Sequence, residues 1–261
     1  MALIRFLLYS NLWVSICFTS LVVIDFYRKG EVDYFYLSFC FFGTIGVYNL
    51  QRWIKIKDYH QTSDRDDWYS KRRKQLFIFG VLSLAFSGAS YLMVENKNWM
   101  ILAVASFSTL FYLPPREIRF LHLRSVGVLK LLTISFVWSL LSIPTLDLES
   151  DKMLLLYRML WVAGITIPFD IRDIYKDATD QIESLPQMIG ELKSRILALL
   201  LFLIGMGGEL IFYDQLTPVF AVFTLVSGGL VFYSRQLSTD WYIAGLVESI
   251  PAIYLLCHLL F

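Results

Sequence analysis

Long apolar stretches recur along this chain at the length that a helix needs to cross a lipid bilayer. A spanning helix takes about 20 mostly apolar residues. Stretches that approach this length lie at about 4–25, 34–54, 75–94, 98–114, 126–146, 153–171, 195–213, 216–234 and 241–260. Because lipid offers no hydrogen-bond partners, the backbone must satisfy its own polar groups, as a helix does. The sequence therefore predicts an all-α, polytopic membrane protein with about nine transmembrane helices.

The composition agrees with a membrane protein and excludes several other classes. Hydrophobic residues make up 57% and charged residues 17% of the chain, whereas soluble domains have about 45–50% and about 25%. The net charge of +1 gives no reason to expect a nucleic-acid partner. The longest polar stretches, about 55–74 and 172–193, are too short for a separate core. We therefore expect residues 1–261 to form a single integral membrane domain, with lipids as its neighbours.

The Lys and Arg residues lie mostly on one side of the predicted membrane. With nine spans, the N-terminus and the polar stretches 55–74 and 172–193 share a side, which holds most of the 23 basic residues. Basic residues concentrate in cytoplasmic connections. This distribution predicts a cytoplasmic N-terminus in a cell (inner) membrane.

Three aspartates at the end of the sixth predicted span form the most informative local pattern. Asp170, Asp173 and Asp177 stand at i, i+3 and i+7, and such positions share one face of a continuous helix. Carboxylate oxygens suit a hard cation such as Mg²⁺, and acidic residues at a membrane boundary are candidates for function. The alternative is a solvated helix end, in which Arg172, Lys176 and water neutralise the carboxylates.

The sequence around these aspartates resembles a known motif. Residues 170–177 read DIRDIYKD and residues 185–190 read LPQMIG. Together they resemble the second aspartate motif of the UbiA-type intramembrane prenyltransferases, DxxDxxxD followed by LPxxxG. The segment FYLPP at 111–115 is similar to that family's Y-x-P-P segment after its fourth helix.

The resemblance implies a fold, a cofactor and a reaction. The implied fold has nine helices around a central cavity that opens toward the cytoplasm. Mg²⁺ would bridge two aspartate motifs and an isoprenyl diphosphate, with Asp170, Asp173 and Asp177 as metal ligands. Loss of the diphosphate would leave an allylic carbocation, which an acceptor captures.

The first aspartate motif of that family is changed in this chain. At the end of the second predicted span Asn49 is present, but Leu50, Trp53 and Lys57 occupy the three aspartate positions. With Arg52 beside them, this stretch is positive where the family pattern is negative. It could contact a diphosphate directly, since Arg and Lys both bind phosphate oxygens. The alternative is a set of orientation signals that contact anionic lipid headgroups.

These observations lead to one principal hypothesis and two alternatives. The chain is expected to transfer an isoprenyl group from a prenyl diphosphate, or a similar lipid phosphate, to an acceptor that the sequence does not identify. The diphosphate contacts would be Asn49, Arg52, Lys57, Lys130, Arg172 and Lys176. The first alternative is a non-catalytic UbiA-like scaffold or lipid-binding subunit, because the first motif has lost its aspartates. The second is a small transporter, for which glycines in the seventh and eighth spans are the only indication.

Overall fold

The structure is a computed structural model that describes residues 2–56, 64–111, 127–147, 149–179, 183–235 and 238–261. It consists of two compact units, Met1–Lys97 and Asn98–Phe261. The sequence predicts a single integral membrane domain, and the division into two units leaves this a prediction.

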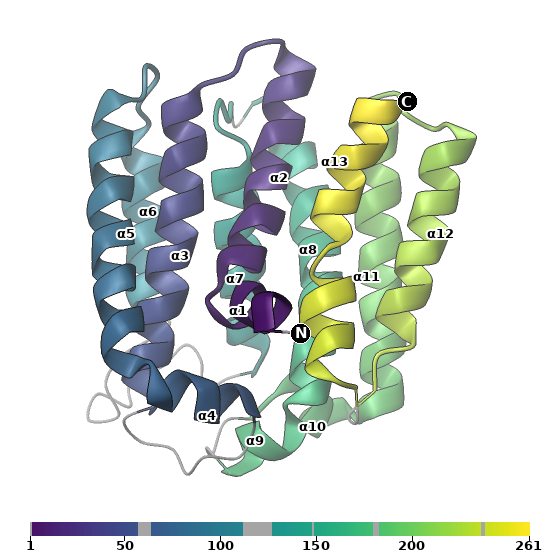
Figure 1. Ribbon diagram of the computed structural model, residues 1–261. Helices are drawn as coiled ribbons and strands as arrows, with labels where there is room; N and C mark the ends of the chain where they lie inside the picture. The colour runs from purple at the N-terminus through teal and green to yellow at the C-terminus, as the bar shows by residue number, and fades with distance from the viewer. Residues whose placement is uncertain (1, 57–63, 112–126, 148, 180–182, 236–237) are drawn as a thin grey trace. The chain divides into compact units, whose positions relative to one another are not determined.

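The first unit is a set of helices in which two long members lie along each other (Figure 1). Its helices are α1 Ala2–Tyr9, α2 Leu12–Lys29, α3 Tyr34–Ile56, α4 Asp64–Lys71 and α5 Arg73–Met93. Helices α3 and α5 approach closely at Gly46, where an added Cβ would collide with the Leu84 side chain. Small residues allow such close approach between membrane helices.

The first predicted span is broken. Helices α1 and α2 meet at an angle of 63°, and Asn11 between them has a left-handed backbone with φ of 64°. Asparagine tolerates this region better than most residues. The Asn11 side chain is buried and donates to Asn49 Oδ1 at 3.2 Å and to the Tyr69 hydroxyl at 2.7 Å. The bend is therefore held by hydrogen bonds from α3 and α4, which the apolar pattern of the stretch does not reveal.

The second unit is centred on a long helix, α8, which spans Lys152–Arg172. Helices α7 (Gly127–Ser142) and α11 (Glu191–Phe212) lie against it. At Gly205 of α11 an added Cβ would collide with the backbone of Tyr157 and Trp161 on α8. The other elements of the unit are α6 Trp99–Phe111, α9 Ile174–Thr179, α10 Leu185–Ile189, α12 Pro218–Phe232, the π-helix η3 Trp241–Val247 and α13 Ile250–Leu260.

A buried ion pair joins α8 to α11. Arg158 and Glu209 are both fully buried, and Arg158 Nη2 lies 2.6 Å from Glu209 Oε1. Trp161 Nε1 donates to Glu209 Oε2 at 2.7 Å, and Arg158 Nη1 donates to the Ser142 backbone oxygen at 3.2 Å. Charges this deep in apolar helices must be paired. The pair therefore ties α7, α8 and α11 together.

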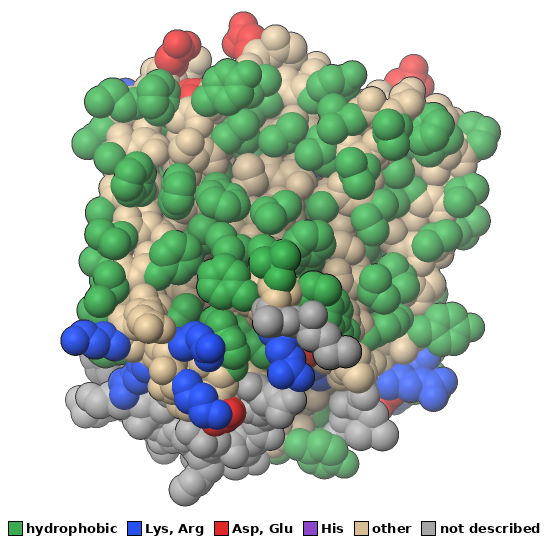
Figure 2. All heavy atoms as spheres, in the orientation of Figure 1, with side chains coloured by type: hydrophobic (Ala, Val, Ile, Leu, Met, Phe, Trp, Pro, Cys, Tyr) green, Lys and Arg blue, Asp and Glu red, His purple; other side chains and the backbone are tan. Residues whose placement is uncertain are grey.

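The fold class predicted from the sequence is confirmed: the described chain is an all-α membrane protein. Four described helices are long and apolar enough to cross a membrane, or five if α1 and α2 form one broken span. Figure 2 shows hydrophobic side chains spread along the length of the helices, as surfaces that meet lipid require. Each of the nine predicted stretches contains helix in its described part, but α6, α7 and α12 are shorter than a full span. The count of nine spans stays a prediction.

Candidate functional site

The aspartate motif of the second unit is not one continuous helix. Helix α8 ends at Arg172, Asp173 caps it with φ of −90° and ψ of 9°, and α9 begins at Ile174. Pro168, four residues before the end of α8, lacks the N–H that would bond to the backbone oxygen of Gly164, which weakens the helix near this end. Residues at i, i+3 and i+7 share one face only where the helix is unbroken. Because the helix breaks at the middle aspartate, the three carboxylates have different partners.

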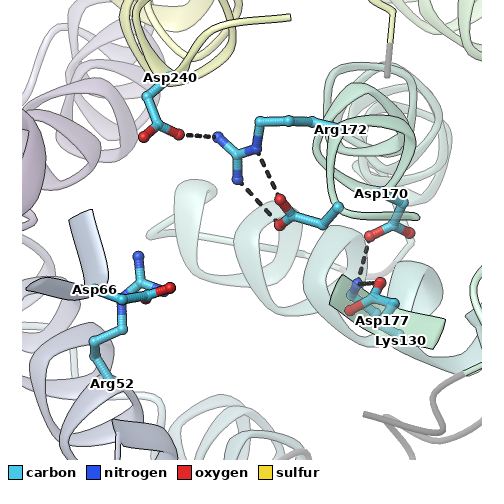
Figure 3. Close-up of polar contacts among 8 residues, drawn as sticks. Arg52, Asp66, Lys130, Asp170, Arg172, Asp177 and Asp240 are labelled. Atoms are coloured by element: carbon cyan, nitrogen blue, oxygen red, sulfur yellow. Dashed lines mark hydrogen bonds and ion pairs between the residues drawn. The ribbon is translucent and has the colours of Figure 1, made fainter. Parts of the chain in front are cut away.

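Lys130 lies between the first and third aspartates. Its Nζ is 2.5 Å from Asp170 Oδ1 and 3.0 Å from Asp177 Oδ2. Figure 3 shows both carboxylates directed at this ammonium, which reaches them from α7. All three side chains are buried, with Lys130 6% and Asp170 1% exposed. The residue predicted to contact a diphosphate is thus held by two of the predicted metal ligands.

Asp173 pairs with a different cation. Arg172 Nε and Nη2 donate to the two Asp173 oxygens at 2.8 and 3.0 Å, and Arg172 Nη1 donates to Asp240 Oδ1 at 3.0 Å (Figure 3). Burial by itself would raise the pKa of Asp173, but the charge and hydrogen bonds of Arg172, helped by Lys130 and Lys176, hold this pKa well below its usual range. Arg172 has five N–H groups, and these bonds use three of them.

The arrangement does not fit a magnesium ion shared by the three aspartates. Among the described residues, no group of three or more His, Cys, Asp or Glu could hold a metal ion. Asp170 and Asp177 do converge, but on the ammonium of Lys130. A divalent ion about 4 Å from that ammonium would be repelled by about 8 kcal/mol at an effective dielectric constant of about 20. In this structure two of the carboxylates surround a lysine and the third pairs with Arg172, and the assignment of all three aspartates as metal ligands stays a prediction.

One oxygen of the aspartate pair has no partner. Asp170 Oδ2 is buried and makes no hydrogen bond with any residue that the structure describes. A buried carboxylate oxygen without a donor costs free energy, so unpaired oxygens of this kind are uncommon. This oxygen therefore has the capacity to accept one more hydrogen bond.

The LPxxxG segment supports the end of the motif. Gln187 Nε2 donates to the Ile174 backbone oxygen at 3.0 Å, which ties α10 back to α9. Gly190 has φ of 86° and stands immediately before α11. A positive φ favours glycine over other residues. The spacing of this segment is thus explained by the turn that returns the chain from α9 into α11.

The altered first motif lies in the other unit, and Asn49 there has a structural role. Asn49 is fully buried, and its Nδ2 donates to the backbone oxygens of Ser10 and Ile45 at 3.0 and 2.9 Å. Its Oδ1 accepts from Asn11. Both amide protons are therefore used within this unit, and contact of Asn49 with a diphosphate stays a prediction.

The guanidinium group of Arg52 lies near residues of α4. Its guanidinium carbon lies 4.8 Å from the centre of the Tyr69 ring, and Nη1 lies 3.8 Å from Asp66 Oδ1. Arg65 of α4 donates to Asn11 Oδ1 at 3.4 Å. Lys57, predicted to act with Arg52, lies outside the described residues, as do the prolines of the FYLPP segment. The described part of the first motif is thus a cationic and aromatic cluster.

Several residues of these clusters were missed by sequence reasoning. Asp240 is far from Arg172 in sequence, and nothing in its local pattern marks it as a partner. Arg158 and Glu209 carried a usable signal, because each is a charged residue inside an apolar stretch. Asn11 carried a weaker one, as a polar residue within the first span.

The comparisons with known proteins agree on the fold. The chain matches no protein-family model, and its sequence matches no curated protein. Its structure is similar to that of a UbiA homolog from Archaeoglobus fulgidus bound to GPP and Mg²⁺, with a TM-score of 0.71 and 12% identity over 98% of each chain. The same homolog bound to DMAPP and Mg²⁺ gives 0.69 and 12% over the same shares.

A third solved structure extends this similarity. A digeranylgeranylglyceryl phosphate synthase gives a TM-score of 0.56 and 15% identity over 98% of this chain and 96% of its own. The chain is therefore a multi-pass helical membrane protein. More particularly, it has the fold of the UbiA homologs, as the resemblance of its second aspartate motif predicted.

Proposed function

We propose that this chain binds an isoprenyl diphosphate, or a similar lipid phosphate, and transfers its prenyl group to an acceptor in the membrane. The observation that carries the proposal is the charged cluster of Lys130, Asp170, Arg172 and Asp177, which lies at the aspartate motif of a UbiA fold. The similar structures were solved with GPP or DMAPP, which supports a diphosphate as the ligand class.

The proposed reaction breaks the bond between the prenyl carbon and a diphosphate oxygen. The electron pair leaves with the diphosphate, and an electron-rich acceptor bonds to the prenyl carbon and then loses a proton. Cations that contact the leaving group favour this step, because charge accumulates there in the transition state. Arg172 has N–H groups beyond those that its carboxylates use, and Lys176 adds charge beside it. Arg52 and Lys57 are the proposed contacts from the first motif.

Magnesium is the cofactor that the fold neighbours suggest, since two of them were solved with it. When present in such a site, it offsets the charge of the leaving diphosphate. The described carboxylates of this chain are already bound to Lys130 and Arg172, so no step here is assigned to a metal. The alternative function, a non-catalytic scaffold or lipid-binding subunit, is favoured by a different observation, the presence of Leu50, Trp53 and Lys57 at the aspartate positions of the first motif.

A titration with geranyl diphosphate tests the proposal. Loss of one charge-assisted contact costs about 1.5–3 kcal/mol, or roughly ten- to a hundredfold in affinity. We expect Arg52→Ala to weaken binding by this factor with Mg²⁺ and also in EDTA. Arg28→Ala is the matched control, because Arg28 lies in the last turn of α2, on the opposite predicted side. Release of diphosphate in the presence of a membrane extract, as the source of acceptor, then distinguishes a transferase from a binding subunit.

Two results would count against this assignment. If the wild type has no affinity for the diphosphate in either condition, the enzyme proposal fails and the scaffold alternative replaces it. If Arg52→Ala binds as the wild type does, Arg52 serves only as an orientation signal.

A further inference from the structure

The ammonium of Lys130 occupies the point on which two carboxylates of the aspartate motif converge. Asp170 Oδ1 and Asp177 Oδ2 lie 2.5 and 3.0 Å from Nζ, and Lys130 is 6% exposed. We infer that Lys130 is the resident cation of this site: it replaces a divalent metal, and its removal creates a divalent-cation site on Asp170 and Asp177. This inference deepens the proposed function. It rests on that function only where it concerns the binding of a diphosphate.

The geometry of the two carboxylates supports a metal site that is blocked by the lysine. Octahedral cations such as Mg²⁺ bind through one or two carboxylates and complete their coordination with water or phosphate oxygens. Asp170 and Asp177 supply that number of carboxylates from two helices, α8 and α9. The unpartnered Asp170 Oδ2, which is buried, supplies a further oxygen. What prevents occupation is the positive charge already present between them.

A resident ammonium changes how the site handles a diphosphate. A metal contributes charge only at concentrations near or above its dissociation constant, whereas a lysine held by two carboxylates is always present. Binding of a prenyl diphosphate to this chain should then be independent of Mg²⁺. The altered first motif agrees, because its aspartate positions hold Leu50, Trp53 and Lys57 and leave no carboxylates for a second metal.

The experiment uses the full chain in detergent and Mn²⁺ as the probe, followed by electron paramagnetic resonance. We expect no saturable Mn²⁺ binding to the wild type or to Lys176→Met, the matched control for loss of a nearby positive charge. Lys130→Met should bind Mn²⁺ at least about a hundredfold more tightly, since a neighbouring charge is removed from a partly desolvated site. The double variant Lys130→Met/Asp170→Asn should lose this gain. Equal Mn²⁺ affinity in the wild type and Lys130→Met would overturn the inference.

A second measurement does not depend on the folding of a variant. A ligand that binds only the folded state raises the melting temperature. The wild type should therefore melt at the same temperature in Mg²⁺, Mn²⁺ and EDTA, and a rise with either metal would overturn the inference. Lys130→Met leaves two buried carboxylates without their cation, so its melting temperature should be low in EDTA and rise with Mn²⁺.

Titration of the same samples with geranyl diphosphate distinguishes this inference from the proposed function. Equal affinity in Mg²⁺ and EDTA supports both. If the Mn²⁺ results are as expected but the chain has no affinity for the diphosphate, Lys130 is still the resident cation and the proposed function is wrong. Affinity that requires Mg²⁺ keeps the proposed function and overturns the inference.

Discussion

The buried Arg158–Glu209 pair offers the sharpest test of the packing in the second unit. Arg158 Nη2 and Nε donate to the two Glu209 oxygens at 2.6 and 3.3 Å, and Trp161 Nε1 adds a third bond at 2.7 Å. Neither charged side chain is exposed. The change to be made is Glu209→Gln, which keeps the shape and an acceptor for Trp161 but removes the negative charge.

The expected loss follows from the burial of the charge that remains. Removal of one partner from a buried ion pair costs about 3–5 kcal/mol, because the other charge stays without compensation. For a chain of this size, 1 kcal/mol corresponds to about 2–4 °C in melting temperature. Glu209→Gln should therefore melt roughly 6–20 °C below the wild type. Replacement of both partners, in Arg158→Met/Glu209→Leu, should cost much less, since apolar substitutes for a buried pair are often neutral or stabilising.

Thermal unfolding in one detergent measures all three proteins. Glu149→Gln is the control, because Glu149 is an exposed acid in a connection of the same unit. A Glu209→Gln variant that melts with the wild type would refute the claim that this charge is needed. A double variant that loses as much stability as Glu209→Gln, or more, would refute the claim that the loss comes from the unpaired charge.

Two further predictions concern orientation and pH. Reporter fusions after Phe261 and within residues 55–74 should report opposite sides of the membrane, because the basic residues place the second of these in the cytoplasm; matching reports would exclude nine spans with this orientation. Because Arg172 lowers the pKa of Asp173, their pair adds stability above the unfolded pKa of about 3.9 and loses it as pH falls toward the folded pKa. The difference in melting temperature between the wild type and Asp173→Asn should be constant from about pH 8 to 5 and shrink below about pH 4. A difference that already shrinks near pH 6 would contradict the pairing of Asp173 with Arg172.

The sequence was sufficient for the fold class because lipid imposes a strong constraint on backbone polar groups. A stretch of apolar residues of the right length has few alternatives to a helix, and helices form at each predicted stretch. The break at Asn11 was not predictable from hydropathy, because it depends on hydrogen bonds that Asn11 donates to Asn49 and Tyr69. Those partners are distant in sequence and become neighbours only when α1, α3 and α4 pack.

For the candidate site, the sequence pattern grouped residues but could not supply the partners of their side chains. The i, i+3, i+7 pattern identified Asp170, Asp173 and Asp177 as a group, and Lys130 was recognised as a basic residue near the ligand. Periodicity could not show that the helix ends at Arg172, since the end depends on local capping and on contacts with Asp240. Which cation meets which carboxylate is a property of tertiary packing, and no spacing rule supplies it.

Salt should screen the ion pairs of Lys130 and Arg52 to different extents, because the two pairs are buried to different extents. Lys130 and its two aspartates are almost fully buried, so mobile ions should screen their attraction little. Arg52, with 20% of its side chain exposed and Asp66 at 3.8 Å, belongs to a looser and wetter pair, which is worth less and is screened more. A diphosphate contact through Arg52 should therefore weaken as salt rises from 0.1 to 1 M, where the Debye length falls from about 10 to about 3 Å. The contribution of Lys130 should stay nearly constant over the same range, because its charge is held by the protein itself.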